Sequence, residues 1–156
     1  MRLEIDREVA APRAVLWRVL TRWEQQPDWM LDAKDVEILT PQRTGVGVTL
    51  RCPTNLLGVT VEDVMRVTRW EEPRLLEVTH LGRVITGDGA FVLDELAPER
   101  TRITWWEEID PPLGALGEWG ASRFVRPVLA LVFARSLARL ARLAEAEAAG
   151  RGHVGA

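Results

Sequence analysis

The sequence predicts a single α+β domain in which a seven-stranded, curved antiparallel sheet surrounds one long C-terminal helix. Two observations support this fold class. Seven short segments either alternate apolar with polar residues or are apolar and bounded by Gly and Pro, which is typical of strands. The segment from residue 116 onward is instead rich in Ala, Leu, Arg and Glu and does not alternate, which is typical of a helix. We expect one domain over residues 1–149 and a flexible tail over residues 150–156.

The N-terminal part predicts a strand followed by two short helical segments. Apolar and charged residues alternate over residues 2–9, so this strand has one buried face. Pro12 suits the first turn of a helix, and the apolar residues after it recur at helical spacing. Pro27 prevents this helix from continuing, so residues 23–29 are expected to form a second short helix or a turn with inward-pointing indoles.

Six further strands are predicted after these helices. A parallel sheet is excluded because the gaps between the strands are too short for helical crossovers, which need a dozen or more residues. The strands therefore form antiparallel meanders. Their predicted positions are residues 35–39, 47–52, 59–69, 75–81, 87–93 and 102–109.

The final predicted element is one long helix over residues 116–149. Apolar residues occupy most of its circumference in the middle, so the sheet must surround it. Pro127 lies inside this segment and removes a backbone hydrogen bond, which predicts a kink or a break near Arg123.

Composition and charge exclude several classes of function. The formal net charge of −3 argues against nucleic-acid binding, which depends on clustered Lys and Arg. Cys52 is the only cysteine, so no intrachain disulfide and no Cys-rich zinc site can form. The longest apolar run, residues 128–134, is far shorter than the ~20 residues that cross a bilayer. The first residues alternate in polarity, unlike a secretory signal. We therefore expect a cytoplasmic protein with no membrane span, no bound metal and no cofactor.

Several residues are predicted to face a pocket between the sheet and the helix. Trp105 and Glu107 share one face of the last strand, and Phe91 shares a face of the preceding strand with two glycines that leave room beneath the helix. Phe124 and Val128 lie on one stripe of the helix. These five residues, together with Arg51 and His80, are candidate ligand-binding residues, although simple core packing is the alternative for the aromatic side chains. Trp106 would point outward.

His80 is the best catalytic candidate because it shares the inward face of its strand with apolar residues and titrates near neutral pH. The alternative is a core histidine, since no Ser, Cys or Asp partner stands at a recognisable spacing. An inward Glu107 would need a cation, from Arg51, Arg66 or Arg123, and such an arginine could instead bind a ligand carboxylate. The alternative for Glu107 is a solvated strand end.

The order of these elements resembles the helix-grip fold of the START and Bet v 1 superfamily (SRPBCC), especially its polyketide cyclase/dehydrase-like branch. Local sequence is similar as well, over residues 9–17 (VAAPRAVLW), 23–29, 67–75 and 133–143. These motifs are structural and include no catalytic signature. The resemblance implies a cavity between the sheet and the helix.

Three hypotheses about function follow. The favoured one is a non-enzymatic binder of a polyketide-, aromatic- or lipid-like molecule, because no catalytic spacing is present. The second is a polyketide cyclase/aromatase-like enzyme in which His80, Glu107 or an arginine moves protons. The third is a protein interaction module that uses Trp106 or Trp119, compatible with a homodimer, and it would be favoured by a filled pocket.

Overall fold

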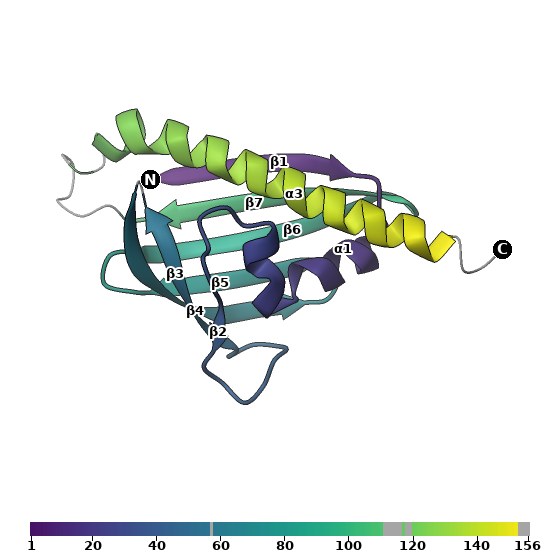
Figure 1. The fold of residues 1–156 in the computed structure, drawn as a ribbon, viewed down its shortest axis with the longest axis horizontal. Coiled ribbons are helices and arrows are strands. Elements are labelled where there is room, and N and C mark those ends of the chain that lie inside the picture. The colour runs from purple at the N-terminus through teal and green to yellow at the C-terminus, as the bar shows by residue number, and fades with distance from the viewer. Residues whose placement is uncertain (57, 111–116, 118–119, 153–156) are drawn as a thin grey trace.

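The computed structural model describes residues 1–56, 58–110, 117 and 120–152 (Figure 1). Seven strands form one antiparallel sheet in the order β1-β7-β6-β5-β4-β3-β2, which confirms the predicted fold class. No helix in this part of the chain is both long and apolar enough to cross a membrane. The strands are β1 (Arg2–Val9), β2 (Glu37–Ile38), β3 (Thr49–Leu56), β4 (Val59–Glu71), β5 (Leu75–Leu81), β6 (Thr86–Ala97) and β7 (Arg100–Ile109).

The first and last strands of the chain are neighbours in the sheet. β1 pairs with β7, the last strand, so the N-terminal strand forms one edge of the sheet. Register shifts interrupt the long strands between Val67 and Arg69 and between Glu95 and Ala97. Such bulges bend a strand and increase its twist, which lets the sheet curve around the elements on its concave face.

Two short helices follow β1, as predicted. They are α1 (Arg13–Leu20) and the 3-10 helix η1 (Trp23–Asp28). Trp23 and Trp29 are 2% and 0% exposed, so both indoles do point inward.

The C-terminal helix α3 (Arg126–Gly152) lies across the concave face of the sheet beside α1 (Figure 1). A π-helical segment, Ala121–Val125, comes directly before it, so the regular helix starts close to the predicted break. Pro127 therefore sits in the first turn of α3, where the missing N–H is not needed. The first predicted residues of the helix, 116, 118 and 119, lie outside the described residues. α3 continues to Gly152, past the expected end at residue 149, and residues 153–156 also lie outside.

α3 buries one face, which corrects the prediction that most of its circumference is buried. Leu137, Leu140 and Ala144 are fully buried against the domain, whereas Leu131 is 50% exposed. The physical reason is that the sheet covers only one side of the helix, so the opposite side meets solvent. Near its C-terminal end α3 is joined to α1, because Glu147 accepts a hydrogen bond of 3.0 Å from Nε of Arg18 on α1, and two more of 2.9 Å from Arg22 just after α1.

Candidate ligand-binding site

A cavity of about 230 Å³ lies between the concave face of the sheet and the elements that cover it, η1 and α3. Its walls are mainly apolar side chains from these three sources. A concave, mostly apolar cavity with a few convergent polar groups is the usual form of a small-molecule site, and this one lies just below the usual volume range of such sites. Apolar lining residues include Met30, Met65, Leu76, Val78, Ile109 and Leu129.

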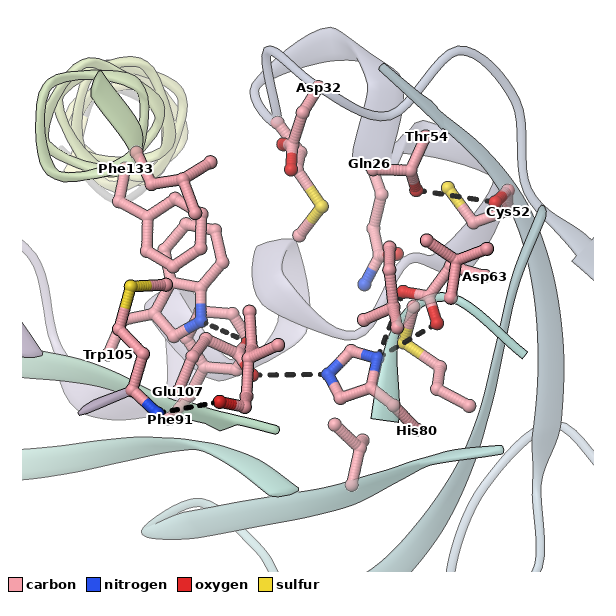
Figure 2. A pocket seen from close by; sticks show the side chains of 18 of the residues that line it. Gln26, Asp32, Cys52, Thr54, Asp63, His80, Phe91, Trp105, Glu107 and Phe133 are labelled. Atoms are coloured by element: carbon pink, nitrogen blue, oxygen red, sulfur yellow. Dashed lines mark hydrogen bonds and ion pairs between the residues drawn. The ribbon is translucent and has the colours of Figure 1, made fainter. Parts of the chain in front are cut away.

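Three aromatic rings, those of Phe91, Trp105 and Phe133, form one side of the cavity (Figure 2). Phe133 of α3 stacks on Trp105 of β7, with ring centroids 3.8 Å apart and planes at 3°. Phe91 of β6 lies 5.0 Å from Trp105, and Trp29 meets both rings edge to face. Such packing holds the rings in one geometry, so this wall is rigid as well as apolar.

His80 lies between two carboxylates at the other side of the cavity (Figure 2). Its Nδ1 is 2.9 and 3.0 Å from the carboxylate oxygens of Asp63 on β4, and its Nε2 is 3.1 Å from Oε2 of Glu107 on β7. All three residues are at least nine-tenths buried. Burial by itself lowers the pKa of His80, but the hydrogen bonds and charges of Asp63 and Glu107 outweigh it and raise the pKa to about 10. His80 is therefore an imidazolium at neutral pH, and both of its N–H groups donate to carboxylates.

The local sequence explains how Glu107 fits beneath the helix. Trp105 shares a face of β7 with Glu107, and its indole N–H donates a hydrogen bond of 2.8 Å to Oε1 of that carboxylate. Gly89 on β6 pairs with Glu107, and a Cβ there would lie 2.6 Å from Oε1. A glycine is required at this position because any side chain would occupy the space of the carboxylate.

Two further polar residues face the cavity from the side opposite the sheet (Figure 2). Gln26 of η1 is 3% exposed. Asp32 lies in the segment after η1, and its Oδ1 is buried without a hydrogen-bond partner. Burial, together with the nearby charges of Glu107 and Asp63, raises the pKa of Asp32 to about 6. Asp32 can therefore gain or lose a proton near neutral pH.

The structure brings four of the seven predicted ligand-binding residues together. His80, Phe91, Trp105 and Glu107 all line the cavity. Glu107 is 6% exposed, so the alternative of a solvated strand end is wrong. Its cation is His80 rather than an arginine, because His80 projects from the same concave face.

The other three predicted residues do not line this cavity. Arg51 is half-exposed and pairs with Glu37, because on β3 the neighbouring Leu50 and Cys52 face inward and Arg51 must face outward. Phe124 precedes α3 and is 65% exposed. Val128 is 44% exposed and lines a second, smaller recess that shares Asp32 with the main cavity. Both fall on the side of the C-terminal helix that the sheet does not cover.

Sequence reasoning missed Asp63, Asp32 and Gln26. For Asp63 a signal exists, because it shares the inward parity of β4 with Val61, Met65 and Val67 and so interrupts an otherwise apolar face. A carboxylate at such a position needs a buried partner. Asp32 and Gln26 lie outside regular strands, where no periodicity indicates which way a side chain points. Among the described residues, no three His, Cys, Asp or Glu side chains are arranged to hold a metal ion.

Known structures with the same fold include proteins of several kinds. TTHA0849 from Thermus thermophilus superposes with a TM-score of 0.79 at 14% identity, over 94% of this chain and 99% of that one. The Zhui aromatase/cyclase from Streptomyces sp. R1128 gives a TM-score of 0.70 at 22% identity, over 97% and 94%. A START superfamily protein from Mycobacterium smegmatis gives 0.67 at 17% identity, over 96% and 97%. At these identities the likeness shows a shared fold.

No curated protein matched the chain. The model of one family does match, over residues 1–145, which is nearly the whole of the domain described above. The sequence therefore shows that this chain belongs to the family described as polyketide cyclase / dehydrase and lipid transport.

Proposed function

We propose that this protein binds a small hydrophobic molecule with an aromatic, polyketide-like or lipid-like body in the cavity between the sheet and α3. The observation that supports this best is the aromatic wall of Phe91, Trp105 and Phe133, backed by Trp29, beside a cavity of about 230 Å³. Burying apolar ligand surface contributes about 25 cal/mol per Å², and a wall already held by its own packing loses little freedom when a ligand binds.

The experiment that tests this proposal asks whether an apolar compound co-purifies with the protein. Native mass spectrometry would be combined with denaturing extraction of the purified protein. We expect a retained compound in the wild type and its loss in Val78→Phe, because Val78 lines the cavity and a phenyl ring there fills it. The matched control is Val59→Phe, because Val59 is 64% exposed.

An empty wild-type protein that also binds no added apolar probe would contradict the proposal. So would a compound that stays bound in Val78→Phe at the level of the control. Circular dichroism would establish that both variants are folded before their contents are compared.

A second candidate function, a cyclase/aromatase-like enzyme, is favoured by one observation. Asp32 has an unpartnered oxygen in the cavity and a pKa of about 6, which suits a group that removes a proton next to a ketone at neutral pH. His80 is less suited to that role because both of its N–H groups already donate to carboxylates. It would instead hold Glu107 and Asp63 in place.

The enzyme hypothesis is tested with a short poly-ketone thioester, whose cyclisation is followed by ultraviolet absorbance. Asp32→Asn should abolish turnover while the substrate still binds, since the amide keeps the shape of the carboxylate but cannot take a proton. Turnover that survives in Asp32→Asn would remove Asp32 from the mechanism.

The interaction-module hypothesis predicts a pocket filled by side chains. The cavity of about 230 Å³ therefore gives it no support. Trp106 is half-buried on the outer face, with the Arg2 guanidinium 5.1 Å above its ring. Trp119 lies outside the described residues. Homodimerisation stays a prediction.

A further inference from the structure

The charged groups that line the cavity are predominantly negative. Among the lining residues that the structure describes, four carry carboxylates (Asp32, Asp63, Glu107 and Asp110) and two carry cationic groups, the imidazolium of His80 and the N-terminal ammonium of Met1. No Arg or Lys is found among the described residues of the lining. In an apolar cavity such an excess repels an anion more strongly than it would in water.

Both cationic groups already donate to the protein. His80 donates to Asp63 and to Glu107, and the N-terminal ammonium donates to the carbonyl oxygen of Ile109 at 2.7 Å. An anionic ligand head would have to displace one of these interactions to find a charged donor, which leaves a buried carboxylate or carbonyl without a partner.

Among the described residues of the lining, Asp32 provides a hydrogen-bond acceptor, and no Arg or Lys provides a cation. Oδ1 of Asp32 is buried with no hydrogen-bond partner, an arrangement that is rare in folded proteins. Hydrogen bonds fix the backbone around Asp32 on two sides. The N–H of Leu31 donates to Oγ of Ser136 on α3 at 3.0 Å, and the N–H of Asn55 on β3 donates to the carbonyl oxygen of Asp32 at 2.8 Å. The backbone therefore keeps Asp32 between α3 and β3, at the cavity.

We infer that the cavity selects a hydrophobic ligand whose polar head donates hydrogen bonds and bears no negative charge, with Asp32 as the acceptor. The inference rests on the proposed binding function and names the ligand class. A hydroxyl or an ammonium head meets both conditions. A carboxylate head, such as that of a free fatty acid, meets neither.

The test uses four ligands that share one ring system and differ only in the head group. 2-Naphthol and 2-naphthylmethylamine donate hydrogen bonds, 2-methoxynaphthalene cannot donate, and 2-naphthoate is an anion. Affinities would be measured by isothermal titration calorimetry at neutral pH. We expect the two donors to bind about tenfold or more tightly than 2-methoxynaphthalene, the gain typical of a hydrogen bond to a charged acceptor. We expect 2-naphthoate to bind most weakly.

Two substitutions separate charge from hydrogen bonding at Asp32. Asp32→Asn keeps an acceptor but removes the charge, so it should weaken the binding of the amine most, weaken that of 2-naphthol only in part and strengthen that of 2-naphthoate. Asp32→Leu removes the acceptor, so 2-naphthol should fall to the affinity of 2-methoxynaphthalene. The matched control is Asp28→Asn, because Asp28 is exposed on η1 and does not line the cavity.

The outcomes distinguish the inference from the function on which it rests. If 2-methoxynaphthalene or 2-naphthoate binds as tightly as 2-naphthol, the inference is overturned and the binding function stands. If none of the four ligands binds, the binding function itself fails. If the donor preference is unchanged in Asp32→Leu, Asp32 is not the acceptor and the inference is overturned. If the amine binds more tightly than 2-naphthol, the ligand class has a cationic head. If 2-naphthol binds more tightly than the amine, the ligand class has a neutral hydroxyl head.

Discussion

Glu107 and His80 are joined by a hydrogen bond of 3.1 Å across β6, the strand that separates theirs in the sheet. Gly87 is the β6 neighbour of His80, and Gly89 is the β6 neighbour of Glu107. Because Gly89 has no side chain, the Glu107 carboxylate can lie above β6 and meet the imidazole there. This relationship gives the cavity its polar floor and makes the stability of the domain depend on pH.

The charge of His80 should stabilise the fold in a defined pH range. Its pKa rises from 6.5 to about 10 on folding, so its stabilising contribution is complete below pH 6.5 and is lost as the pH rises toward 10. We expect the free energy of unfolding to fall by about 2 kcal/mol between pH 6.5 and pH 8.5, measured by urea denaturation.

The variant His80→Gln isolates this effect because it has no imidazolium to lose. Its free energy of unfolding should be lower than that of the wild type at pH 6.5 and nearly constant up to pH 8.5. A wild-type curve as flat as that of the variant would mean that His80 is not protonated in the folded protein. The pH range of the measurement ends at 8.5, below the titration of Cys52. Burial raises the pKa of that thiol from 9.0 to about 11.

Gly89→Ala should displace the Glu107 carboxylate. The new methyl group would lie within 2.6 Å of that carboxylate, and side-chain movement there breaks the hydrogen bonds from His80 and Trp105. We expect a loss of about 2–4 kcal/mol in the free energy of unfolding, because a buried charge network is disrupted.

The control for this substitution is Gly150→Ala on α3, where a Cβ meets nothing within 4 Å. Alanine is a better helix former, so this variant should be as stable as the wild type or slightly more stable. Equal stability of Gly89→Ala and Gly150→Ala would show that the space beside Glu107 is not needed.

Asp32→Asn should stabilise the domain above pH 6. Burial raises the pKa of Asp32 from 3.8 to about 6, so the folded state disfavours the ionised carboxylate, and this cost is complete once the pH exceeds 6. We expect a gain of about 1–2 kcal/mol at pH 7.5, shrinking toward zero near pH 4, from thermal or urea unfolding. A variant less stable than the wild type at pH 7.5 would show that the ionised carboxylate is paired in solution.

Glu147→Gln should loosen the contact between α1 and α3. The carboxylate accepts a hydrogen bond of 3.0 Å from Arg18 on α1 and two of 2.9 Å from Arg22 just after α1, and it is 23% exposed, so solvent screens it only in part. We expect a loss of about 1 kcal/mol, reduced at high salt. Glu24→Gln is the control, since Glu24 and its partner Arg43 are both more than half exposed and should contribute almost nothing. Equal effects of the two substitutions would contradict the prediction.

The local pattern of the sequence determined the order of the elements and much of the inward face. Alternation with a period of two identified which strand residues face the helix, and it placed His80, Phe91, Trp105 and Glu107 correctly. The same parity indicates that Arg51 faces outward and Asp63 inward, so these two positions could have been predicted from β3 and β4. The short gaps between the strands were enough to predict an antiparallel sheet, because a parallel sheet needs helical crossovers that do not fit into them.

Only the tertiary structure decided which side chains meet. His80 is 17 residues from Asp63 and 27 from Glu107 in the sequence. The strand register that brings the three together is set by all the residue pairs along the neighbouring strands, and not by these residues alone. The side of α3 that is buried depends on how the helix docks, so Phe124 and Val128 could not be assigned from their stripe alone. Asp32 follows no periodic pattern, and it lines the cavity because α3 and β3 hold its backbone from either side.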